Sequence, residues 1–253
     1  MNDKRFAVLI DSDNISHRYI KAIVDEVANE GISTYKRIYG DWTNPKLASW
    51  KDVLLSNSIM PIQQYSYTTG KNATDSAMII DAMDILYSGN VEGFFLVSSD
   101  SDFTRLASRL RESGMYVVGM GERKTPAAFI SACNKFKYLE VFAEDYKKEA
   151  KAKNGKVKTE PPEPAEPQAS PRANRVEIMR AIRTIIQEKS DENGWVFVGE
   201  IGNILSKRYP DFDSRNYGFQ KLTQLVTSFQ AFDVQSRPTS DPNTKLFYAK
   251  MKE

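Results

Sequence analysis

Two stretches of the chain, FAVLIDSDN at residues 6–14 and FFLVSSDSDF at residues 94–103, each join a continuous apolar run to a group of aspartates. An apolar run without alternation is typical of a strand that is covered on both faces of a parallel sheet. Ligands of such sheets bind beyond the carboxyl ends of the strands. The two stretches therefore predict a buried parallel sheet with an acidic edge, because Asp11 directly follows one apolar run and Asp100 follows the other after two serines.

The rest of the first 146 residues alternates between short apolar runs and helical periodicities. Strands are predicted at residues 6–10, 34–39, 59–64, 94–98, 116–119 and 138–142. Helical patterns lie between them at residues 15–27, 45–56, 74–87, 102–112 and 126–133. Repeated units of this length predict an α/β fold, a parallel sheet with helices on both faces and right-handed crossovers.

The composition changes sharply at residues 147–171, where Lys, Pro and Glu dominate and large apolar side chains are almost absent. Such a segment cannot bury enough surface to offset the entropy of ordering, so it is predicted to be a flexible linker. We expect a first domain at residues 1–146 and a second at residues 172–253. In the second, helices at 176–187, 199–209 and 214–229 and a hairpin of 232–237 with 245–250 predict a small winged helix-turn-helix.

The composition excludes several classes of protein. Of 253 residues, 41% are hydrophobic and 27% charged, which is typical of a globular protein. One cysteine (Cys133) and one histidine (His17) exclude an internal disulfide and zinc sites built on those residue types. With no apolar run of about 20 residues and no signal-peptide pattern at the start, we expect a cytoplasmic protein that does not enter a membrane.

Four aspartates, Asp11, Asp75, Asp100 and Asp102, are predicted to meet at the carboxyl edge of the sheet. Any one of them alone is explained more simply as a helix cap. Together they repel, because two charges about 4 Å apart cost roughly 4 kcal/mol at an effective dielectric near 20. A cation relieves this repulsion, and oxygen ligands without His or Cys select Mg²⁺ or Mn²⁺. Asp81 lies about 240° around the helix from Asp75 and is a lower-ranked metal ligand.

These residues form motifs that resemble a known family. The motifs are ID-x-x-N (Ile10, Asp11, Asn14), K-x-x-x-D-x-x-x-x-x-D (Lys71, Asp75, Asp81) and S-x-D-x-D-F (Ser98, Asp100, Asp102, Phe103). Over about residues 4–145 they resemble the NYN domain, which belongs to the PIN-like group of metal-dependent nucleases with a Rossmannoid sheet. The resemblance implies RNA cleavage with Mg²⁺ or Mn²⁺ held by Asp11, Asp75, Asp100 and Asp102, with Asn14 as a polar helper. Ser99 stands where the family usually has glycine.

The second domain resembles an OST-HTH/LOTUS domain. The residues that carry the resemblance are Gly194-Trp195-Val196, Pro210-Asp211-Phe212-Asp213 and the segment from Arg215 to Leu222. The resemblance implies binding of RNA, with G-rich RNA as a candidate, or docking to a protein partner. By their charge, Arg215, Lys221, Arg237 and Lys245 are candidate phosphate contacts here, and Lys71 and Arg105 in the first domain. Tyr217 is either a stacking platform for a base or part of the core.

The leading hypothesis is a metal-dependent ribonuclease that cuts single-stranded RNA and recruits it through the second domain. One alternative is an adaptor that binds RNA or a protein without cleavage. A less favoured one is a phosphohydrolase of the haloacid-dehalogenase type, with Asp11-Ser12-Asp13 as nucleophile and acid. The oligomeric state is left open.

Overall fold

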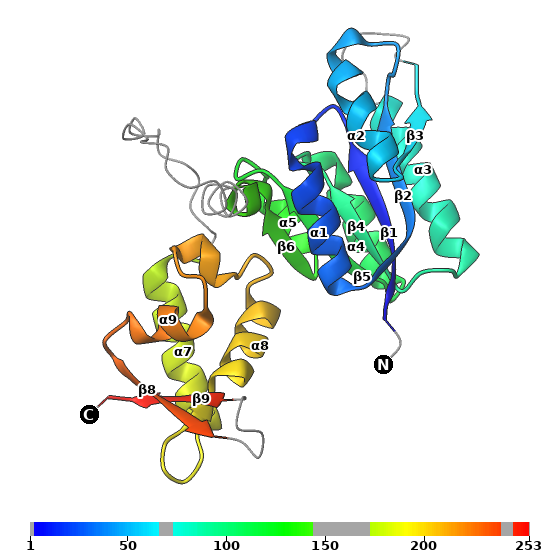
Figure 1. Ribbon diagram of the computed structural model, residues 1–253. Helices are drawn as coiled ribbons and strands as arrows, with labels where there is room; N and C mark the ends of the chain where they lie inside the picture. The colour runs from blue at the N-terminus through cyan, green and yellow to red at the C-terminus, as the bar shows by residue number, and fades with distance from the viewer. Residues whose placement is uncertain (1–2, 66–72, 144–172, 239–244, 253) are drawn as a thin grey trace, which may run out of the picture. The chain divides into compact units, whose positions relative to one another are not determined.

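The computed structural model describes residues 3–65, 73–143, 173–238 and 245–252. The chain forms two compact units, Met1–Ala169 and Ser170–Glu253 (Figure 1). The linker predicted at residues 147–171 lies outside the described residues, so its boundaries stay a prediction. Among the described helices, none combines the length and apolar character needed to cross a membrane.

The first unit is built on a six-stranded sheet in the order β3-β2-β1-β4-β5-β6, with every pairing parallel. The strands are β1 (Arg5–Asp11), β2 (Ile32–Gly40), β3 (Met60–Gln63), β4 (Gly93–Val97), β5 (Tyr116–Gly121) and β6 (Lys135–Tyr138). Because β1 pairs with both β2 and β4, the strand order reverses between β1 and β4. A ligand crevice is expected at the carboxyl ends of these two strands.

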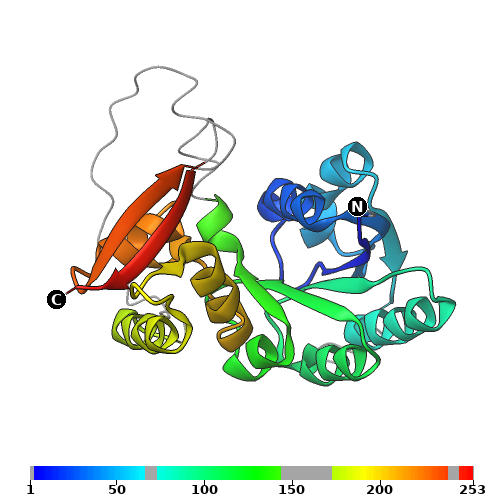
Figure 2. The same cartoon turned by 90° about the horizontal axis from the view of Figure 1, so that it is seen from below.

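Helices cover both faces of this sheet (Figure 2), as predicted. On one face lie α1 (Ile20–Glu30), the 3-10 helix η2 (Pro45–Trp50) and α2 (Lys51–Ser56). On the other lie α3 (Ala73–Ser88), α4 (Thr104–Glu112) and α5 (Ala127–Ala132). Successive side chains of β1 point to opposite faces of the sheet. Phe6, Val8 and Ile10 therefore pack into one core, and Ala7 and Leu9 pack into the other. Cys133 is buried in the second of these cores.

The last strand of the sheet differs from the prediction. It was expected at residues 138–142, but β6 is Lys135–Tyr138 and residues 139–143 are helical. The strand is not an apolar run, because two of its residues are lysines, Lys135 and Lys137. Lys137 has only 4% of its side chain exposed, and it forms ion pairs with Glu26 and Glu30 of α1. The Lys137 charge is therefore neutralised inside the protein and does not face solvent.

The second unit consists of helices and a three-stranded antiparallel sheet in the order β7-β9-β8. Its elements are α7 (Arg175–Lys189), β7 (Val196–Phe197), α8 (Val198–Arg208), the 3-10 helix η4 (Ser214–Tyr217), α9 (Leu222–Thr227), β8 (Phe232–Pro238) and β9 (Lys245–Met251). A capping box begins α7, because Asn174 accepts from the Glu177 backbone N–H and Glu177 accepts from that of Asn174. The predicted combination of helices and a hairpin is confirmed.

The third helix of this unit was predicted as one segment at residues 214–229, and that is wrong. The short turn η4 ends at Gly218, whose φ of 85° is left-handed, and Lys221 is extended before α9 begins. A left-handed residue interrupts the helical hydrogen-bond ladder, and glycine adopts that conformation without steric cost. Arg215 therefore lies on a separate turn and not on the same helix as α9.

Candidate metal centre

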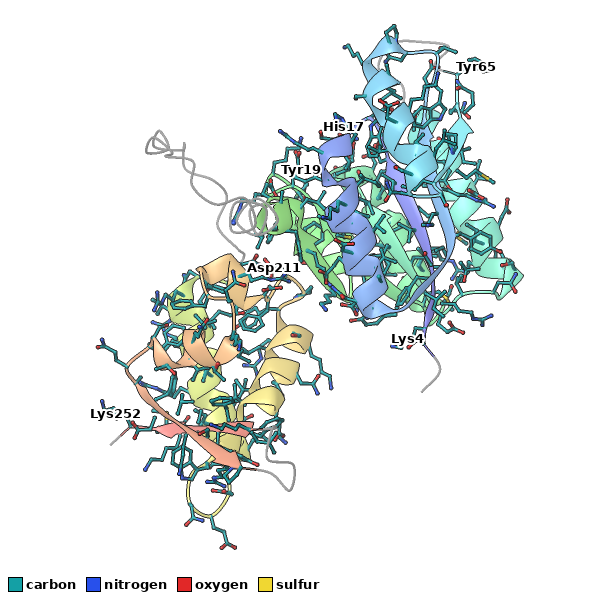
Figure 3. All side chains as sticks on the ribbon, viewed as in Figure 1. Lys4, His17, Tyr19, Tyr65, Asp211 and Lys252 are labelled. Carbon is teal, nitrogen blue, oxygen red and sulfur yellow. The ribbon has the colours of Figure 1, made fainter. Side chains whose placement is uncertain are left out.

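Three aspartates of the first unit converge. Asp75, Asp100 and Asp102 each offer a carboxylate oxygen, and these oxygens all lie within 4.8 Å of one another. Asp75 is in the first turn of α3, and the other two lie in the segment directly after β4. Figure 3 helps to locate this edge of the sheet, because Lys4 precedes β1 at one end and Tyr65 follows β3 at the other. The aspartates lie at the end where the strands finish, as the sequence predicts.

Local hydrogen bonds shape the segment after β4 and hold the Asp100 carboxylate in place. Asp100 is the N-cap of the 3-10 helix η3 (Ser101–Phe103), and its Oδ1 accepts from the Asp102 backbone N–H at 3.0 Å. The Asp100 backbone N–H donates to Ser98 Oγ at 3.0 Å. Phe103 is fully buried and fixes the far end of the turn in the core. The turn that carries Asp100 and Asp102 is thereby anchored at Ser98 and at Phe103.

Asp11 lies at the end of β1 but is not one of the three mutually close acids. It is 1% exposed, and four donors satisfy its oxygens. These are the backbone N–H groups of Asp13 (3.0 Å) and Asn14 (3.3 Å), Asn14 Nδ2 (2.8 Å) and Ser98 Oγ (2.7 Å). Asn14 therefore positions Asp11 in this structure. The roles of both residues at a metal stay predictions.

The electrostatics at this edge are unfavourable without a cation. Burial, and after it the negative charges of Asp11, Asp100, Asp102 and Asp13, raise the pKa of Asp75 to about 6. Burial also raises the pKa of Asp11, against the hydrogen bonds from Ser98 and Asn14 that lower it. Asp75 thus carries the repulsion predicted for this cluster, and a bound cation would relieve it.

The donor set fits a small divalent cation. Mg²⁺ binds oxygen at about 2.1 Å in an octahedron, which places ligand oxygens about 3.0 Å apart when adjacent and about 4.2 Å when opposite. The three carboxylate oxygens lie within 4.8 Å of one another, so only small side-chain movements are needed to reach these separations. Throughout the described parts of the chain, no second group of three such side chains comes this close.

Other candidates of the first unit are placed elsewhere. The Asp81 carboxylate accepts from the Arg37 guanidinium and the Tyr39 hydroxyl. Both partners lie on β2, so the Asp81 side chain faces that strand and its charge is already paired. The structure does not bring Asp81 to the three aspartates. Arg105 is exposed on α4, and Lys71 lies outside the described residues.

Sequence analysis missed the role of Ser98. Its hydroxyl donates to Asp11 Oδ2 and accepts from the Asp100 backbone, so one fully buried side chain connects the ends of β1 and β4. The signal was present as the serine two residues before Asp100 in the S-x-D motif. Only the pairing of β1 with β4 shows which carboxylate that serine reaches.

Two residues predicted to bind RNA in the second unit are used within the fold. The Tyr217 hydroxyl donates to the Ala173 carbonyl at 2.8 Å, and its ring packs beside Phe212 with 6.0 Å between the centroids. The structure thus favours the core alternative for Tyr217 over a stacking platform. Arg215 forms a two-pronged ion pair with Asp213, at 3.0 Å from Nε and 2.6 Å from Nη2.

The remaining candidates of the second unit lie on its surface. Lys221 and Lys245 are exposed, before α9 and at the start of β9. Arg237 lies on β8 with its guanidinium carbon 4.3 Å from the centroid of the Tyr248 ring. These three positions remain candidate contacts for phosphate.

Two protein-family models match the chain, one in each unit. The model of the NYN domain matches residues 5–140, more than half of the chain. The chain belongs to the NYN family. NYN domains are part of the PIN-like nuclease superfamily, and the three aspartates lie within the matched region. The model of the OST-HTH/LOTUS domain matches residues 172–244, so the two domains occur in the order that the motifs predict.

Among solved structures, this NYN protein is similar to two whose functions are not described. One is a protein of unknown function from Vibrio parahaemolyticus, 19% identical over 53% of this chain and 92% of the other, with a TM-score of 0.45. The second is an uncharacterised protein from Nitrosomonas europaea, 32% identical over 39% of this chain and 93% of the other, with a TM-score of 0.26. No curated protein matches the chain.

Proposed function

We propose that this NYN protein is a metal-dependent ribonuclease that hydrolyses RNA phosphodiester bonds at the carboxyl edge of its parallel sheet. The observation that carries the proposal is the convergence of Asp75, Asp100 and Asp102, with carboxylate oxygens within 4.8 Å of one another in a domain of the PIN-like superfamily. The three side chains would hold Mg²⁺ or Mn²⁺. The ion, when bound, supplies an activated water and neutralises negative charge on the phosphate.

The residues around the three aspartates would keep the cluster in shape before substrate arrives. The Ser98 hydroxyl donates to the Asp11 carboxylate and accepts from the Asp100 backbone N–H. The ends of β1 and β4 therefore cannot separate freely. Asp11 adds negative charge beside Asp75, which favours a cation at the site. It would itself become a ligand by exchanging one of its present donors for the ion. Arg105 is placed on the exposed surface of α4, where it would contact a phosphate.

The second unit would supply RNA affinity. Its family match supports a role in binding RNA, and single-stranded or G-rich RNA is the proposed class. A tethered binding unit raises the local concentration of substrate at the nuclease unit without requiring one fixed geometry between them.

The proposal is tested by cleavage of a 5′-labelled single-stranded RNA in Mn²⁺ or Mg²⁺. We expect cleavage that stops when EDTA is added and that falls at least about 100-fold in Asp100→Asn, because a ligand is lost. Asp84→Asn is the matched control, an exposed aspartate on α3 outside the cluster, and it should cleave at the wild-type rate.

Four results would count against the proposal. Cleavage that persists in EDTA, or an unchanged rate in Asp100→Asn, would remove the aspartates from the reaction. RNA retained without cleavage in Mn²⁺ would favour the adaptor. Release of phosphate from p-nitrophenyl phosphate would favour the phosphohydrolase.

A further inference from the structure

The sheet of the second unit has one face that the hydrophobic core does not use. Side chains alternate along its strands, so Val196, Phe232 and Ala249 face inward and are buried. Phe197 pairs with Tyr248 across β7 and β9, and both therefore project from the opposite face. Arg237 and Lys250 share that face by the same alternation.

Aromatic rings and cations contact one another on this surface. The Phe197 and Tyr248 centroids are 5.8 Å apart, with the rings tilted at 53°. The Arg237 guanidinium lies 4.3 Å from the Tyr248 centroid and 5.5 Å from that of Trp195. Lys250 Nζ lies 5.3 Å from the Trp195 centroid. We call this set of five residues, Trp195, Phe197, Arg237, Tyr248 and Lys250, the outer-sheet face.

The outer-sheet face remains open to solvent. Phe197 is 37% exposed, and the other four side chains are partly exposed. None of the five belongs to the core cluster of this unit or to the partly buried side chains packed against it. Arg237 forms a long ion pair, 3.9 Å from Nη1 to Oδ2 of Asp191 on the rim of the surface. A phosphate could therefore approach the guanidinium without displacing a short ion pair.

This combination has a specific chemical use. A cross-strand aromatic pair stabilises a sheet by itself, but that function does not require exposed cations. Exposed rings and the guanidinium plane of arginine stack on unpaired bases, and Lys and Arg neutralise the phosphates between them. Double-stranded nucleic acid does not offer its base planes, so the surface suits a single strand.

We propose that the outer-sheet face is the surface on which the second unit binds single-stranded RNA. Bases stack on Phe197, Tyr248 and Trp195, and Arg237 and Lys250 contact phosphates. The inference deepens the proposed function and rests on it, since it assumes that RNA is the ligand. It moves the main contacts from the region of Arg215, whose guanidinium is already paired with Asp213, to the sheet.

The experiment measures binding separately from cleavage. The full chain is titrated against a fluorescently labelled 12-nucleotide oligouridylate in EDTA, and anisotropy reports the affinity. Phe197→Leu and Tyr248→Leu keep apolar area but remove a stacking plane, and each should weaken binding about tenfold. Arg237→Gln should reduce the slope of log affinity against log salt by about one. Unlabelled double-stranded DNA should compete poorly.

Matched controls test whether the effect belongs to this surface. Tyr87→Leu removes an aromatic side chain that is 74% exposed on α3, and Lys207→Gln removes an exposed cation on α8. Both should bind as wild type. Calorimetry shows whether each variant keeps the melting transition of the second unit. Should Tyr248→Leu lose that transition, Phe197→Leu and Lys250→Gln decide the question.

The inference is overturned if Phe197→Leu and Lys250→Gln bind within twofold of wild type. It is also overturned if the wild-type chain shows no saturable binding to the oligouridylate, which would favour a protein partner for this face. The proposed function fails in a different way. Binding that depends on the outer-sheet face, with no cleavage in Mn²⁺, would sustain this inference and remove the nuclease assignment.

Discussion

Replacing Asp75 by asparagine should stabilise the metal-free protein. Asp75 lies partly buried at the start of α3, and burial followed by the charges of Asp11, Asp100, Asp102 and Asp13 raises its pKa to about 6. Asparagine has nearly the same shape but carries no charge. The substitution therefore removes both the desolvation cost and the repulsion from the folded state.

The size and sign of the effect follow from proton linkage. An unperturbed aspartate titrates near 3.9, so the difference of about two units corresponds to about 3 kcal/mol in the free energy of unfolding. Because much of the carboxylate remains open to water, screening reduces this to about 1–2 kcal/mol. The folded carboxyl holds its proton more tightly than the unfolded one, so wild-type stability falls as pH rises from about 4 to about 6. The increase in the free energy of unfolding of Asp75→Asn over wild type should reach its full size at pH 7.5. At pH 4.5 it should be about a third as large.

Differential scanning calorimetry of the full chain in EDTA measures this effect. At pH 7.5 the transition of the first unit should rise by about 2–8 °C in Asp75→Asn. Asp84→Asn, at an exposed position of the same helix, should leave it unchanged. Adding Mg²⁺ should stabilise the wild type more than Asp75→Asn, because only the wild type keeps all three carboxylates. A transition in Asp75→Asn that is unchanged or lower at pH 7.5 without metal would refute the reasoning.

Three further substitutions test separate parts of the structure. Ser98→Ala should lower the free energy of unfolding by about 1–3 kcal/mol in urea denaturation, because the buried Asp11 carboxylate and the Asp100 N–H each lose a partner. Lys137→Met should cost about 3–5 kcal/mol, since it leaves the Glu26 charge unpaired inside the protein; an unchanged urea midpoint would contradict this. Asn174→Ala should remove about 1 kcal/mol by loss of the capping box, with only the calorimetric transition of the second unit shifted.

Much of the fold could be predicted because its signals are local. Apolar runs without alternation specify strands buried on both faces, and the aspartates that follow two of them mark the acidic edge. Asp11 and Asp100 were placed at that edge on this basis, and the pairing of β1 with β4 confirms the arrangement of the strands that carry them. Where local signals conflict with tertiary contacts, the prediction failed. The lysines of β6 hid a strand because their partners on α1 are distant in sequence.

The sequence by itself determined the parallel sheet, the two-domain order and the group of acids, since burial patterns and strand ends are properties of short segments. Tertiary structure alone decided which acids approach one another. Asp75, Asp100 and Asp102 converge, whereas Asp11 is held by Ser98 and Asn14, and Asp81 pairs with Arg37. It also decided that Tyr217 packs inward and that the outer-sheet face gathers rings and cations from three strands. Such contacts depend on register and side-chain direction between distant segments, which no local pattern encodes.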